Sequence, residues 1–256
     1  MKLNKIYCMD NLELLKQLPD DSIDLIYSDI LFATGRDFKD YKDLPYDKES
    51  VDEFYNPRIK EMHRVLKDNG TLVLQMDYRI DHWLRFICDE HFGYKNCINV
   101  VSWAYSSGGS SKKKLSQKND TLIIYAKNPN KQTFNPMKQK SYNRDFKPYR
   151  FKGVEEFQDE YGLWYTMVNM KCIWDDIPMV GRTSGERVDY ATQKPIKLLD
   201  RIIQLYTNEG DLVADFFMGS GTTIVSAKNL NRNYIGCDIN SKSIEITEKR
   251  LNKQLK

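Results

Sequence analysis

The chain contains 256 residues with a net charge of +3, and its 41% hydrophobic and 29% charged residues are typical of a globular protein with one large domain. No apolar run approaches the roughly 20 residues of a membrane-spanning helix, and the first residues lack a signal-peptide pattern, which excludes membrane and secreted classes and predicts a cytoplasmic protein. The five cysteines are scattered without Cys-x-x-Cys spacing, so neither a disulfide framework nor a bound metal is expected.

The first half of the chain alternates between two hydrophobic patterns. Short continuous apolar runs predict strands buried on both faces, and apolar residues at helical spacing predict amphipathic helices. One helix is expected to stop at Asp68-Asn69-Gly70, because glycine after a polar pair commonly ends a helix. Strands are predicted at residues 5–9, 23–27, 71–76, 98–105 and 121–126, helices at 11–18, 51–66 and 81–91, and a loop at 33–50.

Basic residues concentrate in the middle of the chain. Between Ser106 and Lys152 there are twelve lysines and arginines but two acids, a net charge of +10, so the rest of the chain carries −7. The Gly-Ser run at 106–111 predicts a flexible joint. Residues 127–180 mix aromatic, basic and proline residues without clear periodicity, which predicts an inserted subdomain with weak regular structure. The charge split suggests that this part of the chain binds a polyanion such as nucleic acid.

Regular alternation returns toward the C-terminus. Helices are predicted at 195–206, 222–230 and 241–253, and strands at 212–216 and 233–237. Strands that alternate with helices along most of the chain predict an α/β fold with a mainly parallel sheet.

A glycine-rich turn follows one of these C-terminal strands. Asp215 ends the strand, and Gly219 and Gly221 precede a helix, so that free N–H groups and missing Cβ atoms allow a ligand to approach the backbone. Asp238 ends the next strand, 19 residues after Gly219, where an acid commonly holds ribose hydroxyls. Because Ile224 replaces the third glycine of a dinucleotide fingerprint and Asp215 would repel a pyrophosphate, a cationic cofactor such as S-adenosylmethionine (AdoMet) fits better.

The same turn resembles a known family motif. Residues 215–223, Asp-Phe-Phe-Met-Gly-Ser-Gly-Thr-Thr, are similar to the AdoMet-binding motif Asp-Pro-Phe-x-Gly-Ser-Gly-Thr-Thr of DNA amino-methyltransferases, and residues 192–195 match that family's Thr-Gln-Lys-Pro motif. A catalytic strand near the N-terminus and a cofactor strand near the C-terminus correspond to the circularly permuted, β-type order of these enzymes. The resemblance implies a Rossmann-like methyltransferase fold, with a mostly parallel seven-stranded sheet flanked by helices and the N-terminal strand as its third strand.

The resemblance also divides the chain and assigns its cofactor site. It implies the catalytic half of the core at 1–105, a basic target-recognition insertion at 106–190 that includes one core strand near 120–126, and the AdoMet-binding half at 191–256. It places the acid of the third strand near the cofactor adenine. The implied cofactor-binding residues are Asp10, Lys194, Asp215, Phe217, Gly219, Ser220, Gly221, Thr222 and Asp238.

The family's catalytic motif, Asp-Pro-Pro-Tyr or Asp-Pro-Pro-Phe, corresponds to Asp29-Ile30-Leu31-Phe32, in which both prolines are replaced. The exocyclic amine of a base is a poor nucleophile, so the site must accept its hydrogens. The Asp29 carboxylate and the Ile30 carbonyl are the predicted acceptors, and Phe32 is predicted to stack on a base flipped out of the duplex. Loss of the prolines removes stiffness from this loop, which leaves open an inactive site in which Ile30 and Leu31 only finish a buried strand.

The basic segment is the predicted target-recognition region. Lysines on the Gly-Ser joint suit phosphate contacts, and arginines among aromatic residues suit contacts to base edges or flipped bases. The residues expected to contact DNA are Lys112, Lys113, Lys114, Arg144, Lys147 and Arg150.

The predicted activity is site-specific transfer of the AdoMet methyl group to adenine N6 in duplex DNA, in a restriction–modification system or as an orphan methylase. In the family, Asp at the first motif position accompanies adenine and Ser accompanies cytosine, so Asp29 favours adenine while Ser28 keeps cytosine N4 open. The sequence also leaves open an RNA substrate, a non-catalytic AdoMet-binding subunit that binds nucleic acid, and a Rossmann oxidoreductase. The expected partners are duplex DNA, a second copy of the chain and a cognate restriction endonuclease.

Overall fold

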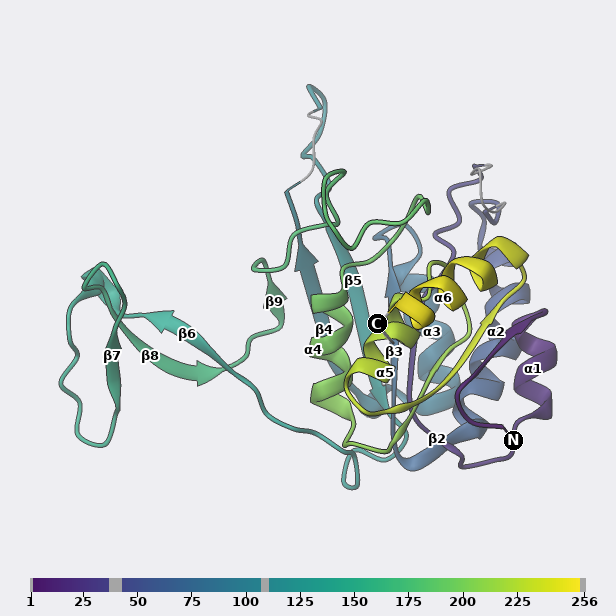
Figure 1. The fold of residues 1–256 in the computed structure, drawn as a ribbon, viewed down its shortest axis with the longest axis horizontal. Helices are drawn as coiled ribbons and strands as arrows, with labels where there is room; N and C mark the ends of the chain where they lie inside the picture. The colour runs from purple at the N-terminus through teal and green to yellow at the C-terminus, as the bar shows by residue number, and fades with distance from the viewer. Residues whose placement is uncertain (1, 37–42, 107–110, 254–256) are drawn as a thin grey trace.

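A computed structural model describes residues 2–36, 43–106 and 111–253 of the chain. Within these ranges the chain forms a main eight-stranded sheet with helices on both faces, and a small three-stranded sheet that stands away from it (Figure 1). The Gly-Ser joint predicted at 106–111 lies almost wholly outside the described residues. No helix in the described ranges is both long and apolar enough to cross a membrane.

The main sheet brings the two ends of the chain together. Its strands in spatial order are β1 (Lys5–Cys8), β11 (Asn233–Asp238), β10 (Leu212–Asp215), β2 (Ile23–Asp29), β3 (Leu66–Met76), β5 (Asn119–Ala126), β4 (Cys97–Ala104) and β9 (Ile173–Trp174). β5 is antiparallel to β3 and β4, and all other neighbours are parallel. Because β10 and β11 lie between β1 and β2, this is the permuted order predicted from the sequence. The two-residue strand β9 adds an eighth strand to the predicted seven.

Helices cover both faces of the main sheet because its central strands are apolar on both sides. On one strand, neighbouring residues point to opposite faces: Ile26 packs in one core, whereas Leu25 and Tyr27 pack in the other. The helices on the Ile26 side are α1 (Asn11–Gln17), α2 (Lys48–Val65) and α3 (Asp81–Phe92), and those on the other side are α4 (Ile196–Tyr206), α5 (Thr222–Asn229) and α6 (Ser241–Lys253) (Figure 1). The predicted bounds of these helices are confirmed to within three residues.

The predicted helix stop at Asp68-Asn69-Gly70 was wrong, because α2 already ends at Val65. The chain enters β3 directly at Leu66, where its pairing with β2 is irregular. A Cβ on Gly70 would come within 2.9 Å of the Lys67 carbonyl oxygen. The glycine therefore permits close packing at the start of a strand and does not cap a helix.

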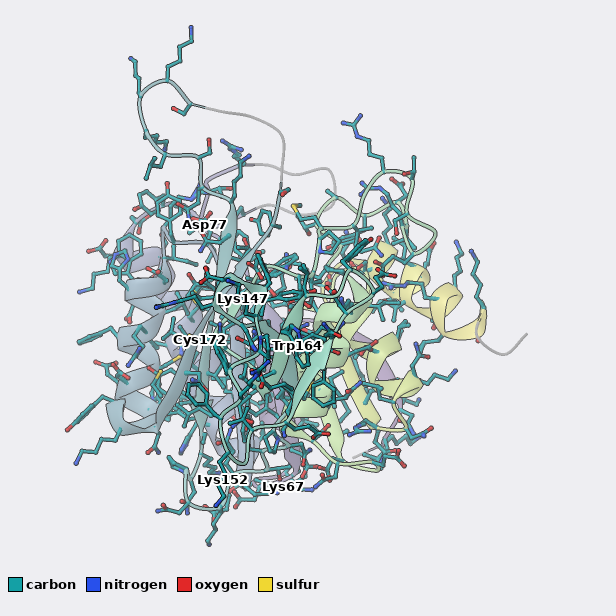
Figure 2. All side chains as sticks on the ribbon, turned by 90° about the vertical axis from the view of Figure 1, so that its left-hand side faces the viewer. Lys67, Asp77, Lys147, Lys152, Trp164 and Cys172 are labelled. Carbon is teal, nitrogen blue, oxygen red and sulfur yellow. The ribbon has the colours of Figure 1, made fainter. Side chains whose placement is uncertain are left out.

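Residues 127–180 contain more regular structure than the sequence predicts. β6 (Lys138–Tyr142), β7 (Glu156–Gln158) and β8 (Trp164–Asn169) form the small sheet, in the order β6-β8-β7 with antiparallel pairing. The expectation of weak regular structure was wrong for these strands because they are short and largely exposed, so their alternation carries little apolar signal. The small sheet faces the viewer in Figure 2, where Trp164 of β8 is labelled together with Lys147 and Lys152 of the connection between β6 and β7.

Candidate active site

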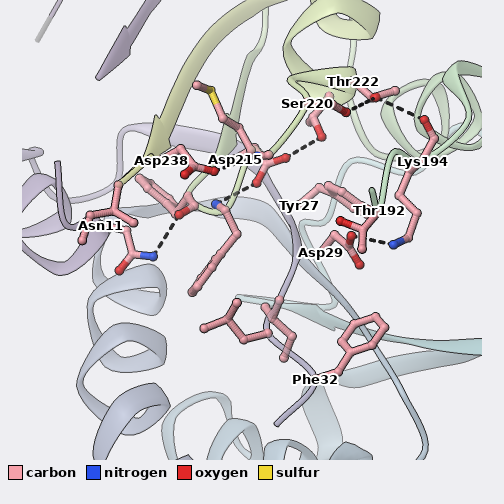
Figure 3. A pocket seen from close by; sticks show the side chains of 18 of the residues that line it. Asn11, Tyr27, Asp29, Phe32, Thr192, Lys194, Asp215, Ser220, Thr222 and Asp238 are labelled. Atoms are coloured by element: carbon pink, nitrogen blue, oxygen red, sulfur yellow. Dashed lines mark hydrogen bonds and ion pairs between the residues drawn. The ribbon is translucent and has the colours of Figure 1, made fainter. Parts of the chain in front are cut away.

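A cavity of about 450 Å³ lies at the carboxyl ends of β2, β10 and β11, the edge at which α/β sheets bind ligands. Its lining comes mainly from the loop after β2, the segment that leads into α4, and the turn after β10 (Figure 3). The structure thus brings together all the predicted catalytic and cofactor-binding residues except Gly221. Those that line the cavity are Asp10, Asp29, Ile30, Phe32, Lys194, Asp215, Phe217, Gly219, Ser220, Thr222 and Asp238.

Asp29 ends β2 with a nearly buried carboxylate, whose side chain is 18% exposed. Its Oδ2 atom lies 2.5 Å from Lys194 Nζ (Figure 3), whereas its Oδ1 atom is buried and has no hydrogen-bond partner among the described residues. Burial raises the pKa of Asp29 to about 6, although the Lys194 ammonium acts to lower it. Asp29 is therefore largely ionised at neutral pH, and one of its oxygens has capacity to accept a hydrogen bond.

Lys194 directs its ammonium group at Asp29, although the resemblance assigns this residue to the cofactor. Lys194 Nζ also lies 4.0 Å from Asp120 Oδ2 and 5.5 Å from the centre of the Phe32 ring. Burial lowers the pKa of Lys194, but the two carboxylates raise it more, so the pKa lies above its ordinary value. Lys194 is therefore a cation at neutral pH, while its contact with a cofactor stays a prediction.

Buried side chains of β2, β3 and β5, together with the half-buried Tyr105 directly after β4, connect to this ion pair. Tyr27 OH donates a hydrogen bond of 2.7 Å to Gln75 Oε1, and Gln75 Nε2 donates one of 2.7 Å to Asp120 Oδ2. Tyr105 OH donates to the other Asp120 oxygen at 2.8 Å. Burial raises the pKa of Tyr27, so its phenol remains a donor. Sequence reasoning missed these residues because a polar contact between strands leaves no mark in a continuous apolar run.

The backbone after Asp29 leaves the sheet and enters the cavity. The Ile30 amide still donates to the Gln75 carbonyl oxygen of β3 at 3.2 Å, and its side chain is buried. Leu31 and Phe32 both line the cavity. The alternative interpretation was that Ile30 and Leu31 only finish a buried strand. It fits the Ile30 amide and side chain, but it does not fit Leu31 and Phe32, which line the cavity.

Asp215 ends β10, and both of its carboxylate oxygens accept hydrogen bonds from residues that follow it in the chain. Its Oδ2 atom accepts the Thr223 hydroxyl at 2.5 Å, and its Oδ1 atom accepts the Phe217 backbone N–H at 3.0 Å. Burial raises the pKa of Asp215 to about 7, and these two hydrogen bonds oppose that rise. Asp215 therefore ties the first turn of α5 to the end of β10 and shapes the turn between them.

The two glycines of this turn have different reasons to be glycine. Both have positive φ, 49° at Gly219 and 73° at Gly221, which residues with a Cβ rarely adopt. A Cβ on Gly221 would collide with Thr247 of α6, and Gly221 does not line the cavity. Gly221 therefore has a packing role against α6, and its contact with a cofactor stays a prediction. Gly219 lines the cavity, where a Cβ would lie 3.1 Å from the Tyr190 ring.

Two further acids end the neighbouring strands. Asp238, at the end of β11, accepts the Gly219 N–H at 2.9 Å on Oδ2. Asp10, directly after β1, caps α1 by accepting the Leu12 N–H at 2.8 Å, and its other oxygen lies 2.8 Å from an Arg58 nitrogen. Both acids line the cavity at the strand ends predicted for them.

The basic residues predicted to contact DNA lie in two separate places outside the cavity. Lys112, Lys113 and Lys114 are exposed on the segment between β4 and β5, beyond the carboxyl edge of the main sheet (Figure 1). The other three are exposed between β6 and β7 of the small sheet. These are Arg144, Lys147 and Arg150.

Comparisons with known proteins place the chain among relatives along its whole length. A family model described as DNA methylase matches residues 23–249. The Type II methyltransferase M.HpaI of Haemophilus parainfluenzae is 31% identical over 253 residues, which cover 98% of this chain and 74% of M.HpaI. The DNA adenine methyltransferase YhdJ of Escherichia coli strain K12 is 29% identical over 251 residues, 94% of this chain and 80% of YhdJ. The crystal structure of an M1.HpyAVI–SAM complex matches with a TM-score of 0.61 and 21% identity, over 97% of this chain and 98% of that one.

Proposed function

Since the chain belongs to the DNA methylase family, we propose that it transfers a methyl group to N6 of adenine in duplex DNA. The protein is a site-specific DNA methyltransferase, and its cofactor is AdoMet. The observation that carries the catalytic proposal is the Asp29 carboxylate, which lines the cavity and retains a buried oxygen with no partner in the described part of the chain. An exocyclic amine donates hydrogens, so it complements this acceptor.

The chemistry of the cavity supports AdoMet. Its volume of about 450 Å³ lies in the range of about 300–1,000 Å³ that is typical of small-molecule sites. Asp10, Asp215 and Asp238 line it, and carboxylates suit ribose hydroxyls and a cationic sulfonium but not a pyrophosphate. When bound, AdoMet supplies an electrophilic methyl group. The residues that we propose to hold it are Asp10, Asp215, Phe217, Gly219, Ser220, Thr222 and Asp238, with Lys194 nearby.

The residues at the end of β2 act on the target base in this proposal. Asp29 Oδ1 and the Ile30 carbonyl oxygen accept the two hydrogens of the amine, which makes its nitrogen a better nucleophile. Lys194 holds the other Asp29 oxygen and favours the ionised carboxylate. Phe32 stacks on the flipped base, which recovers about 1–3 kcal/mol of the few kcal/mol that flipping costs. In-line placement of the amine then supplies much of the acceleration.

The choice of adenine rests on Asp29 as the first residue of the motif. In the resembling family this residue type accompanies adenine, and YhdJ is named a DNA adenine methyltransferase. If Ser28 were the first residue instead, Phe32 would fall one place late for stacking. Cytosine N4 is therefore the alternative that the experiment below separates.

We also propose that the two separate groups of exposed basic residues, between β4 and β5 and between β6 and β7, both bind the duplex. The three lysines at 112–114 would contact phosphates beyond the carboxyl edge of the main sheet, because their side chains are exposed and lie outside the cavity lining. Arg144, Lys147 and Arg150 would contact DNA farther along the duplex, from the small sheet. This arrangement would span more of the duplex than the cavity alone.

The biological setting is part of the same proposal. M.HpaI is named a Type II methyltransferase, which supports a role in restriction–modification with a cognate endonuclease as partner. We infer that the protein acts in the bacterial cytoplasm, where the chromosome lies. A second copy of the chain as partner remains a prediction, which analytical ultracentrifugation with and without DNA would test.

Product analysis tests the proposed function directly. The purified protein is incubated with labelled AdoMet and mixed-sequence duplex DNA, and the modified nucleosides are identified by mass spectrometry. N6-methyladenine is the expected product, with Asp29→Ala as the control that abolishes it. N4-methylcytosine would contradict the base assignment. Bound AdoMet without any transfer would contradict the catalytic proposal and favour a non-catalytic binding subunit.

A further inference from the structure

The loop that follows Asp29 has an unusual backbone. Ala33, one residue after Phe32, has φ of +48°, a left-handed conformation that residues other than glycine rarely adopt. Ala33 is completely buried. Such a conformation persists only where the surroundings hold it in place.

Asp43 supplies part of that support. Its Oδ1 atom accepts the Ala33 N–H at 3.0 Å, and its Oδ2 atom accepts the Thr34 N–H at 2.7 Å and the Thr34 hydroxyl at 2.6 Å. Oδ1 also accepts the Leu44 N–H at 2.9 Å. Asp43 is 4% exposed, so these charge-assisted hydrogen bonds are shielded from water. One carboxylate therefore joins the two arms of the loop.

Tyr55 holds the same loop at Leu31, two residues before Ala33. Its hydroxyl donates a hydrogen bond of 2.9 Å to the Leu31 carbonyl oxygen. Tyr55 belongs to α2 and is 1% exposed, and burial raises the pKa of its phenol, so the group remains a donor. The loop between Leu31 and Thr34 is thus bonded at both ends to rigid or buried groups.

We propose that Asp43 and Tyr55 are positioning residues for methyl transfer. They hold the backbone from Leu31 to Thr34 and thereby aim the Ile30 carbonyl and the Phe32 ring. Neither Ile30 nor Leu31 restricts its own φ as a proline would, so stiffness at this site comes from hydrogen bonds to distant residues. The inference rests on the proposed roles of Ile30 and Phe32.

Amide hydrogen exchange tests the support without any need for activity. In Tyr55→Phe and in Asp43→Asn, a peptide covering residues 28–36 should exchange faster than in the wild type. Tyr125→Phe is the matched control, because its buried hydroxyl bonds Asp89 at 2.5 Å on α3, outside the cavity lining. Unchanged exchange in both loop variants, or an equal increase in the control, would overturn the inference even if the proposed function holds.

Kinetics test whether the support matters for the reaction. The assay uses labelled AdoMet and mixed-sequence duplex DNA, so it detects methylation of either base. Each loop variant should lose about tenfold or more in kcat, because small displacements of reacting groups slow catalysis strongly. The Kd for AdoMet should stay within about threefold, since its proposed ligands are untouched. Asp24→Asn, a buried aspartate that accepts the Leu212 N–H at the far end of β2, is the control for Asp43. Equal losses in this control, or an unchanged kcat in both loop variants, would contradict the proposal.

A proline substitution separates stiffness from other effects. Leu31→Pro should raise the kcat of the Tyr55→Phe variant. The proline ring restricts φ at residue 31, whose carbonyl oxygen no longer accepts the Tyr55 hydroxyl in that variant. The same substitution in the wild type should change kcat by no more than about twofold, because the carbonyl is already held there. A failure to raise kcat in the Tyr55→Phe chain would show that Tyr55 does not act through loop stiffness.

Discussion

β2 and β10 are neighbouring parallel strands, and each ends in a buried aspartate whose pKa is raised by burial. Asp215 accepts hydrogen bonds on both oxygens from residues of its own turn. Asp29 has one oxygen without a partner among the described residues, and the other contacts Lys194, 165 positions away in the chain. The same place on the sheet edge therefore produces two different groups, a structural carboxylate and one with acceptor capacity to spare.

The two carboxylates differ mainly in their partners, although Asp215 is also the more deeply buried of the two. A buried acceptor without a hydrogen bond costs about 1–3 kcal/mol of stability, so the Asp29 oxygen that has no partner in the described part of the chain is retained at the expense of the fold. Such groups are expected where a substrate completes the hydrogen bonds. Both oxygens of Asp215 already accept hydrogen bonds, and this carboxylate also determines the shape of the turn that lines the cavity.

The largest expected effect separates the two aspartates. Asp29→Ala should lower methyl transfer by at least about a hundredfold, because it removes the proposed acceptor for the amine. The Kd for AdoMet, measured by calorimetry, should stay within about threefold, since Asp29 is not proposed to hold the cofactor. If AdoMet binding weakened more than transfer slowed, the comparison between the two strand ends would fail.

Lys194→Gln tests the role of the ion pair between Lys194 and Asp29. Without the ammonium group the pKa of Asp29 should rise above about 6, so the acidic limb of the kcat profile should move to higher pH. Below the new pKa, kcat should fall by up to about tenfold for each pH unit that the limb moves, because only the ionised carboxylate acts as acceptor. Lys194→Arg should keep the profile close to that of the wild type. An acidic limb that does not move in Lys194→Gln would show that Lys194 does not influence Asp29.

Asp238→Ala tests the neighbouring strand end. Loss of the proposed hydrogen bonds to ribose should raise the Kd for AdoMet by about tenfold, with a smaller effect on kcat at saturating AdoMet. Asp211→Ala, at the opposite end of β10, is the matched control because its carboxylate accepts the Asn208 N–H far from the strand ends that form the cavity. Equal affinities in the wild type and in Asp238→Ala would remove Asp238 from the cofactor site.

Asp215→Asn tests the structural carboxylate through pH. Because burial raises the folded-state pKa of Asp215 from 3.8 to about 7, the folded protein binds more protons than the unfolded chain between these values. The wild type therefore loses stability from this group as pH rises from about 4 to about 7, and the variant does not. Relative to the wild type, the free energy of unfolding of Asp215→Asn should rise by at least about 1 kcal/mol over this range. Urea unfolding at several pH values measures it, and a constant difference would contradict the raised pKa.

The smallest effect should come from residues remote from both strand ends. Replacement of Lys112, Lys113 and Lys114 by glutamine should lower the salt slope of DNA binding by up to about 3, because each lysine that neutralises a phosphate adds about one to that slope. The kcat at saturating DNA should be unchanged. Lys131→Gln is the control, because this lysine pairs with Asp68 beyond the opposite end of β5. An unchanged slope in the triple variant would show that these lysines do not bind phosphates.

Much of the fold was predictable because its signals are local. Apolar runs marked seven strands of the main sheet, and α6 has the predicted bounds Ser241–Lys253. The signals failed where burial was incomplete or irregular, as in the small sheet, in the two-residue β9 and at the start of β3. The cavity itself was largely predictable, because acids that end parallel strands must meet at one edge of a sheet.

The sequence by itself determined most of the elements of the main sheet and its helices, because local periodicity is read along the chain. The resemblance to a known family implied the permuted order of the strands and the motifs that line the cavity. The tertiary structure alone decided how those residues pair. It brought Lys194 to Asp29, placed Thr247 against Gly221, and joined Asp43 and Tyr55 to the loop after β2. These contacts depend on strand register and on helix packing between distant segments, and no local pattern of residues encodes which partner a buried polar group will meet.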